Sequence, residues 1–101
     1  MSVGAVAACA DLVGGMDRVL ETSVEYVKTR KQFGQLIGEF QLIQAKLADM
    51  YTSLSACQSY SYGVARTADR GKPIRKDAAG CLLFAAERAT QTALQAVQTL
   101  G

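Results

Sequence analysis

The stretch RKQFGQLIGEFQLIQAKLADM, residues 30–50, decides the fold because one helix ends in it and another begins. A helical apolar pattern stops at about residues 30–31, and two glycines follow, at Gly34 and Gly38. Glycine often ends a helix because it adopts backbone angles that other residues avoid. A second helical pattern starts at about Glu39. The stretch therefore predicts two helices joined by a short loop.

Upstream of this stretch, apolar residues recur at helical intervals and predict a first helix. Its expected inward stripe consists of Val6, Ala10, Val13, Leu20, Val24 and Val27. Gly14 and Gly15 interrupt the pattern, and each costs a helix about 1 kcal/mol relative to alanine. This cost predicts a compensating reason, namely close contact with a neighbouring helix or a ligand.

Downstream, a second helix is expected over about residues 39–68, and a third over about residues 74–100. Between them, Gly71 is the expected helix terminator and Pro73 opens the next segment. The second stripe is Phe40, Ile43, Leu47, Met50, Leu54, Cys57, Val64 and Ala68, and the third is Ala79, Leu82, Leu83, Ala86, Ala89, Ala93, Leu94 and Val97. Three long helices with short links predict an all-α fold, an up-down-up antiparallel array in one domain over residues 1–101.

The chain has more large apolar side chains than one seam of three helices can accommodate. The excess is visible in Tyr26, Tyr51, Tyr60, Tyr62, Leu83 and Phe84, whereas Met16 and Met50 are expected to fill the core. Apolar surface should therefore remain for a fourth helix or another chain.

The composition excludes several classes of function. A formal charge of +2 is too small to imply a nucleic-acid partner, and the absence of His removes the commonest general base and metal ligand. Cys9, Cys57 and Cys81 are too far apart for zinc-type pairing, so we expect buried, reduced thiols and no metal site. The apolar run over residues 3–9 is too short for a membrane span and lacks the basic flank of a signal peptide. An intracellular, cytoplasmic protein is expected.

Several separated motifs resemble the C-terminal helical domain of flavin-dependent acyl-CoA dehydrogenases. Residues 30–50 resemble the helix–turn–helix centre of that domain, and VGGMDRVLE, residues 13–21, resembles its first helix. AAERA, residues 85–89, and AVQTLG, residues 96–101, resemble the helix that ends in the family's Gln-x-x-Gly-Gly signature. The second half of the chain looks most similar to the isovaleryl-CoA and short-branched-chain type. The resemblance implies a C-terminal domain truncated before its last helices.

The resemblance also implies a site for FAD that belongs to a neighbouring subunit. The residues that match the family's cofactor contacts are Arg30, Phe33, Gln41, Gln98 and Gly101. Arg30 would bind the diphosphate, because a guanidinium forms bidentate contacts with phosphate oxygens. Gln41 would bond the same ligand from the start of the second helix, Phe33 would cover the cofactor, and Gln98 and Gly101 would meet its adenosine end.

Each of these residues also has a purely structural interpretation. Arg30 could be a basic residue that interacts favourably with the helix dipole at a C-terminus. Gln41 and Gln98 could be ordinary helix-surface residues, and Phe33 could be a core anchor.

No catalytic residue is expected in this chain. The family uses a Glu to remove the α-proton while hydride passes to the flavin. One type carries that Glu at the start of the first helix, where this chain has Gly4, and the CoA-contacting Asp and Arg would align near Ser2 and Ala5. Other members carry the Glu on a later helix. The glutamates that this chain does contain are expected to be solvated helix charges or caps: Glu21, Glu25, Glu39 and Glu87.

The resemblance therefore implies part of an FAD-dependent enzyme that oxidises the Cα–Cβ bond of an acyl-CoA. This segment would supply subunit contacts and an inter-subunit wall around FAD, and would be inactive alone. The implied partners are further copies in a dimer or tetramer, an acyl-CoA substrate and an electron-transfer flavoprotein, in the mitochondrial matrix if the source is eukaryotic. The alternatives are a non-catalytic family member and a ligand-free helical oligomerisation module.

Overall fold

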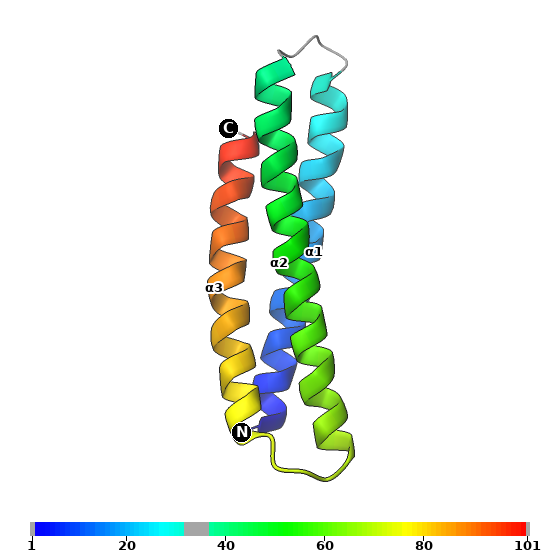
Figure 1. Cartoon of the computed structure of the whole chain (residues 1–101), viewed down its shortest axis with the longest axis vertical. Coiled ribbons are helices and arrows are strands. Elements are labelled where there is room, and N and C mark those ends of the chain that lie inside the picture. Colours follow the sequence, from blue (N-terminus) through cyan, green and yellow to red (C-terminus); the bar gives the residue numbers. More distant parts are fainter. Residues whose placement is uncertain (1, 32–36, 101) are drawn as a thin grey trace.

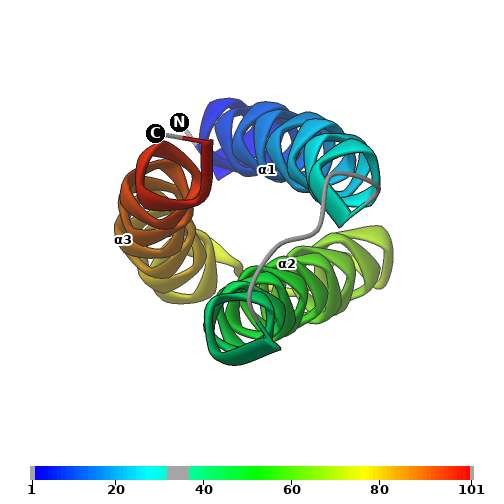
Figure 2. The ribbon, with the colours of Figure 1, turned by 90° about the horizontal axis from the view of Figure 1, so that it is seen from above.

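The computed structural model describes residues 2–31 and 37–100, with side chains over residues 4–29 and 41–99. It contains the helices α1 (Ser2–Lys31), α2 (Ile37–Asp69) and α3 (Arg75–Leu100). In Figure 1, α1 and α3 run in one direction and α2 runs against both, in a molecule of 54 × 18 × 17 Å. Seen along the bundle (Figure 2), the helices stand at the corners of a triangle and each packs against the other two. The predicted all-α up-down-up array is confirmed.

The end of α2 is set by Gly71, as its sequence position predicts. Gly71 has a φ of 74°, which lies in the left-handed region that glycine adopts at little cost. Its N–H donates to the Ala68 carbonyl at 2.9 Å, and the Lys72 N–H donates to the Thr67 carbonyl at 3.3 Å. These two bonds form a Schellman motif, which satisfies carbonyl groups at the helix end. The helix bounds lie within two residues of the predicted ones.

The core lies between the three helices and draws on all of them. Met16 and Met50 are 2% and 0% exposed, which confirms them as core filler. The three cysteines are buried and free, as predicted. The main cluster consists of Cys9, Met16, Leu54, Cys57, Val64, Ile74, Ala78, Cys81 and Ala85. Small side chains dominate the α3 contribution, so the helices approach closely.

The predicted inward face of α3 is wrong. Six members of that stripe are exposed: Ala79, Leu83, Ala86, Ala93, Leu94 and Val97. The residues that α3 buries instead are Ala78, Cys81, Ala85, Thr92, Ala96 and Thr99. The error has a physical cause, because α3 has apolar residues on two faces and periodicity alone cannot choose between them. Of the larger side chains in the predicted stripe, Leu82 packs partly buried against the core, whereas Leu83, Leu94 and Val97 are exposed.

Smaller corrections apply to α1 and α2. Ala10 and Ala68 are exposed rather than inward, and Leu47 is only half-buried. The side chain of Phe40 lies outside the described residues. At the glycine pair, the three described helices do not provide the close helix contact that was one of the two expected reasons, and the other, a ligand, stays a prediction. Within the described chain, a methyl group built on Gly15 meets nothing within 4 Å, and one on Gly14 meets only Arg18 Nη1 at 3.9 Å.

The expected surplus of exposed apolar side chains is confirmed. Tyr51, Tyr62 and Leu83 are 62%, 66% and 65% exposed. Tyr60 and Phe84 instead pack on each other across α2 and α3, with ring centroids 5.9 Å apart. No helix in the described ranges is long and apolar enough to cross a membrane.

Candidate functional site

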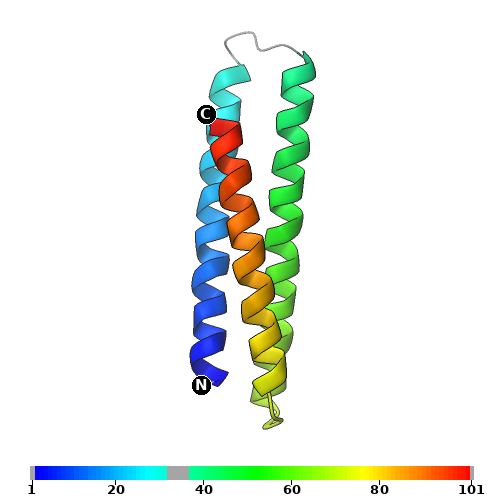
Figure 3. The same ribbon diagram turned by 90° about the vertical axis from the view of Figure 1, so that its left-hand side faces the viewer.

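The helix ends that carry the described candidate cofactor contacts lie toward one end of the bundle. α1 finishes there at Lys31, α2 begins at Ile37, and α3 finishes at Leu100 (Figures 1 and 3). Two short connections and three long helices produce this arrangement, because each reversal sends the chain back along the bundle; α3 is shorter and finishes below the other two ends (Figure 3). Segments separated by about sixty residues of sequence therefore meet at one end.

The structure describes only some of the predicted contact residues. The backbone of Arg30 lies in the last turn of α1, but its side chain is outside the described residues, as are Phe33 and Gly101. Gln41 is exposed one turn into α2, and Gln98 is exposed in the last turn of α3. Both amides are thus available at the same end of the molecule, and the individual FAD contacts stay predictions.

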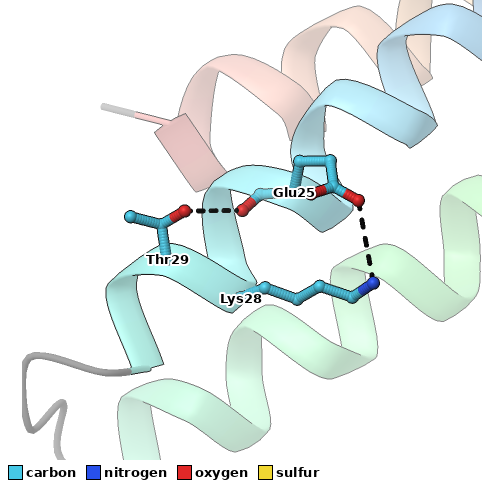
Figure 4. Close-up of polar contacts among 3 residues, drawn as sticks. All are labelled: Glu25, Lys28 and Thr29. Carbon is cyan, nitrogen blue, oxygen red and sulfur yellow. Dashed lines mark hydrogen bonds and ion pairs between the residues drawn. The ribbon is translucent and has the colours of Figure 1, made fainter.

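Figure 4 shows the polar contacts in the last turns of α1. The Glu25 carboxylate lies 3.7 Å from the Lys28 ammonium, and both side chains are 70% exposed. The Thr29 hydroxyl donates to the Glu25 carbonyl at 3.1 Å. An exposed pair of this kind contributes at most about 0.5 kcal/mol. Glu25 is therefore a solvated helix charge, as predicted.

Two other glutamates, Glu21 and Glu87, are equally unsuited to remove a proton from a bound substrate. Glu21 and Glu87 are exposed to solvent, whereas the side chain of Glu39 lies outside the described residues. A general base needs an enclosed position beside the reacting atom. The described carboxylates of these residues have no such enclosure.

The backbone at this end favours an anion at one place. The first N–H groups of α2 have no partner within their helix, and the helix dipole adds partial positive charge there. The start of α2 follows the basic end of α1, where Lys28, Arg30 and Lys31 stand in sequence. This combination is typical of phosphate binding. The end can hold an anion and hydrogen-bond a polar ligand, but the described groups offer no route for proton transfer.

Among the described residues, the thiols of Cys9 and Cys57 have a raised pKa, and both lie in the core. Burial raises the pKa of Cys9 from 9.0 to about 12, and a hydrogen bond with Cys81 and the proximity of Cys57 add to the effect. Burial also raises the pKa of Cys57. The Ser61 hydroxyl lies 3.4 Å from the sulfur of Cys81. Neutral, enclosed thiols are poor nucleophiles, so these residues serve packing.

Two further features lie away from this end. A surface hollow of about 250 Å³ is lined by Ser59, Tyr60, Gly63, Val64, Thr67 and Asp77, near the connection between α2 and α3. None of the predicted contact residues lines it. Across the described residues, no group of three or more His, Cys, Asp or Glu side chains is placed to hold a metal ion.

Sequence analysis missed a pair of buried polar groups on α3. Arg88 Nε and the Thr92 hydroxyl are buried and have no hydrogen-bond partner among the described residues. The Arg88 guanidinium lies 5.9 Å from the centre of the Phe84 ring. The sequence feature that could have indicated it is Arg88 itself, a charged residue within an alanine-rich helix. An arginine in such a position can face inward or toward a partner as readily as toward solvent.

The fold and the grouping of these segments define a class of protein, an antiparallel helical domain in which the end of α1, the start of α2 and the end of α3 lie toward one end of the bundle. The model of the family "Acyl-CoA dehydrogenase, C-terminal domain" matches residues 1–101. The chain belongs to this family, and the resemblance found in its sequence is confirmed.

Relatives are similar over most of the chain. The mitochondrial isovaleryl-CoA dehydrogenase of Oryza sativa subsp. japonica is 62% identical over 89 residues, which are 88% of this chain and 22% of that protein. The mitochondrial 2-methylacyl-CoA dehydrogenase of Solanum tuberosum is 57% identical over the same shares. Among solved structures, "PigA with FAD and proline" superposes with a TM-score of 0.90 at 38% identity, covering 100% of this chain and 26% of that one. The chain therefore spans about a fifth of the length of the curated relatives that it matches.

Proposed function

We propose that this chain forms part of an FAD-dependent acyl-CoA dehydrogenase that oxidises the Cα–Cβ bond of a short, branched acyl-CoA. The observation that carries this proposal is the match of the whole chain to the C-terminal domain of the family. The substrate class is supported by the 62% and 57% identities to relatives named for isovaleryl-CoA and 2-methylacyl-CoA. FAD is supported by the structural neighbour that was solved with it.

Within such an enzyme, the segment would form a wall against the ADP part of FAD held mainly by a neighbouring subunit. The start of α2 supplies free N–H groups, and the end of α1 supplies Arg30. A diphosphate needs this combination of positive charge and directed donors. The exposed amides of Gln41 and Gln98 lie at the same end and would bond the rest of the cofactor. The chemistry of the residues therefore fits FAD.

The chain would bind and orient, and the oxidation would depend on other parts of the enzyme. Bound FAD supplies the acceptor for the hydride that leaves the substrate. The described part of this chain has no enclosed carboxylate to remove the accompanying proton. We therefore expect the isolated chain to be inactive, with the catalytic base supplied from outside residues 1–101.

The remaining assignments follow from the same comparison. The enzyme would be a homo-oligomer, either a dimer or a tetramer, because the cofactor wall comes from a second subunit. It would pass electrons to an electron-transfer flavoprotein. A eukaryotic parent would work in the mitochondrial matrix, since the plant relatives are named as mitochondrial.

The first prediction tests the cofactor assignment in a complete enzyme that carries this segment. Replacing Arg30 with alanine should weaken FAD binding by about 10- to 150-fold, because loss of a charge-assisted hydrogen bond costs about 1.5–3 kcal/mol. Arg30→Lys should restore only part of the affinity, since an ammonium lacks the bidentate geometry. The measurement is flavin absorbance per subunit after dialysis.

Arg18→Ala and Arg75→Ala provide matched controls, because both residues are exposed arginines on helices of the same chain. Neither should change flavin content. Equal flavin retention in Arg30→Ala and Arg18→Ala would show that Arg30 is only a helix-end charge. The cofactor wall would then have lost its main support.

A further inference from the structure

The three cysteines of this chain come from three different helices and lie in one cluster. Cys9 is on α1, Cys57 on α2 and Cys81 on α3, and all three belong to the buried core. Their side chains are 1%, 0% and 1% exposed, and the chain has no other cysteine. The bundle therefore collects all of its thiols in one place.

Within the cluster, Cys9 and Cys81 lie side by side. α1 and α3 run in the same direction and start at the same end of the bundle (Figures 1 and 3). At 1.5 Å per residue, Cys9 lies about 10 Å along α1 from Ser2, and Cys81 lies about 9 Å along α3 from Arg75. The two thiols are thus at one level, and Cys9 has a hydrogen bond with Cys81, whereas Cys57 acts on it only through its proximity.

A hydroxyl group lies beside this pair of thiols. Ser61 on α2 is half-buried, and its Oγ lies 3.4 Å from the Sγ of Cys81. A hydroxyl can donate a hydrogen bond to a thiolate and so stabilise it. Burial has the opposite effect on Cys9, because it raises the pKa of that thiol to about 12. Cys81 is therefore the thiol of the pair that should react first.

We propose that Cys9 and Cys81 form a redox-sensitive pair, which a hydroperoxide converts into a disulfide between α1 and α3 after local opening at the start of α1. Hydrogen peroxide is the simplest oxidant of this class. The proposal is independent of the proposed function, because it involves no residue of the candidate cofactor end.

The oxidation has two steps. In the first, the sulfur of Cys81 attacks one oxygen of the peroxide, so that an S–O bond forms and the O–O bond breaks. The leaving hydroxide takes the thiol proton, which gives a sulfenic acid and one water. In the second, the sulfur of Cys9 attacks the sulfur of Cys81, so that the S–S bond forms and the S–O bond breaks. A second water leaves with the Cys9 proton, and two thiols have then given two electrons to the peroxide.

The start of α1 is the part of the bundle that can open to admit the oxidant. Enclosed thiols are unreactive while the helices are packed, so the reaction needs such an opening. The end of a helix separates from a fold at a lower free-energy cost than its centre does. The segment SVGAVAA, residues 2–8, has no side chain larger than valine, and Gly4 and Ala7 are exposed. This segment buries little apolar surface, and its release uncovers Cys9.

The disulfide should also change the stability of the bundle. It joins α1 to α3 and closes a long loop of chain, which restricts the unfolded state. The midpoint of thermal unfolding should therefore rise by about 5–20 °C on oxidation and return after reduction. A midpoint that falls on oxidation would contradict pairing of the thiols in the native fold.

The main experiment is oxidation of this chain by hydrogen peroxide in native buffer, followed by peptide mapping with mass spectrometry. The expected product is the Cys9–Cys81 disulfide, which dithiothreitol should reverse. The same oxidation in urea gives the comparison, because an unfolded chain favours the shortest loop and should pair Cys57 with Cys81. A native product that contains Cys57, a sulfinic acid without a disulfide, or an unreacted native chain would overturn the proposal.

Cysteine variants separate the pair from the third thiol. Cys57→Ala should still form the disulfide, whereas Cys9→Ala and Cys81→Ala should not. Circular dichroism establishes that each variant keeps the helical fold, and the peptide map of the parent chain decides the pairing even where a variant does not fold. A disulfide that forms in Cys9→Ala as fast as in the parent would overturn the assignment.

Gly4→Ala tests the local opening. Gly4 is exposed, and a methyl group built on it meets nothing within 4 Å in the described chain. Alanine favours the helix, so disulfide formation should slow by about two- to fivefold. Gly63→Ala is the matched control, because it is an equally open glycine on α2, and it should leave the rate unchanged. Equal slowing by both variants would show that the thiols react only after global unfolding, and it would overturn the local route.

Discussion

Gly80 lets α2 and α3 approach each other around the side chain of Tyr60. A methyl group built on Gly80 lies 2.6 Å from Tyr60 Oη and 3.7 Å from Cζ. Tyr60 is 38% exposed, so its ring can move outward, but doing so disturbs its contact with Phe84. The local backbone would favour alanine at position 80, and only the tyrosine hydroxyl opposes it.

This conflict gives the prediction that Gly80→Ala and Tyr60→Phe are coupled. In a Tyr60→Phe background, Gly80→Ala should stabilise the chain by about 1 kcal/mol through helix propensity. In the parent chain most of that gain should be lost, because an aromatic contact of about 0.5–1.5 kcal/mol is disturbed. Urea unfolding of the four variants of the cycle measures the difference. Gly63→Ala is the control, since a methyl group there meets nothing within 4 Å of it in the described chain. Equal effects of Gly80→Ala in both backgrounds would contradict the predicted collision.

The core cysteine Cys9 gives a prediction about pH. Its pKa is about 12 in the folded chain against 9.0 ordinarily, so above pH 9 the unfolded chain loses a proton that the folded chain keeps. This group therefore leaves the free energy of unfolding unchanged below pH 9, and it lowers that free energy as the pH rises from 9 toward 12. The slope from this group is at most about 1.4 kcal/mol per pH unit.

Urea unfolding of the parent and of Cys9→Ala at pH 8, 9.5 and 10.5 provides the measurement. The variant should be less stable at pH 8, because a buried side chain becomes smaller, but it should lose less stability as the pH rises. Both chains contain the same tyrosine and lysine residues, so the difference between their pH curves reports on the Cys9 thiol. Parallel pH curves for the two chains would rule out the expected contribution.

At the scale of the helices, Leu54 is the leucine of α2 whose truncation should destabilise the chain most. It is 4% exposed within the core cluster, and Leu54→Ala should destabilise the chain by about 2–5 kcal/mol. Leu42→Ala is the matched control on the same helix, because Leu42 is 67% exposed and its truncation should change stability by less than about 0.5 kcal/mol. Leu47→Ala should fall between them, since Leu47 is half-buried. Thermal or urea unfolding measures these losses of stability. Equal losses for Leu54→Ala and Leu42→Ala would show that the described inward face of α2 is wrong.

α3 differs from the other two helices in having two apolar faces. Its inward face is built from alanine, cysteine and threonine, and its outward face carries Leu83, Leu94 and Val97. The outward apolar side chains are exposed in the described chain, so apolar surface remains on α3 after the three helices have packed.

At the scale of the whole molecule, the candidate cofactor end lies apart from the core thiols and the surface hollow. It lies where α1 finishes and α2 begins, and α3 finishes lower along the bundle (Figure 1). The thiols lie between the helices and the hollow lies near the opposite end.

Much of the candidate site was predictable, since motif order places the site residues near helix ends. Alternating helices of similar length then bring the end of α1, the start of α2 and the end of α3 together. The side chains of Gln41 and Gln98 are exposed there. Which atoms they contact depends on a cofactor and a subunit outside this chain, and no local pattern contains that information.

The sequence by itself determined where the helices begin and end and that there are three of them. Those features depend on local chemistry, such as the left-handed backbone of Gly71 and the unbroken apolar period on either side of it. Only the tertiary structure decided which face of α3 turns inward, that position 80 lies against the Tyr60 hydroxyl, and that the three thiols lie together in the core. These outcomes depend on the shapes of all three helices at once, because close packing selects small residues at the contact even where larger apolar residues lie on the opposite face.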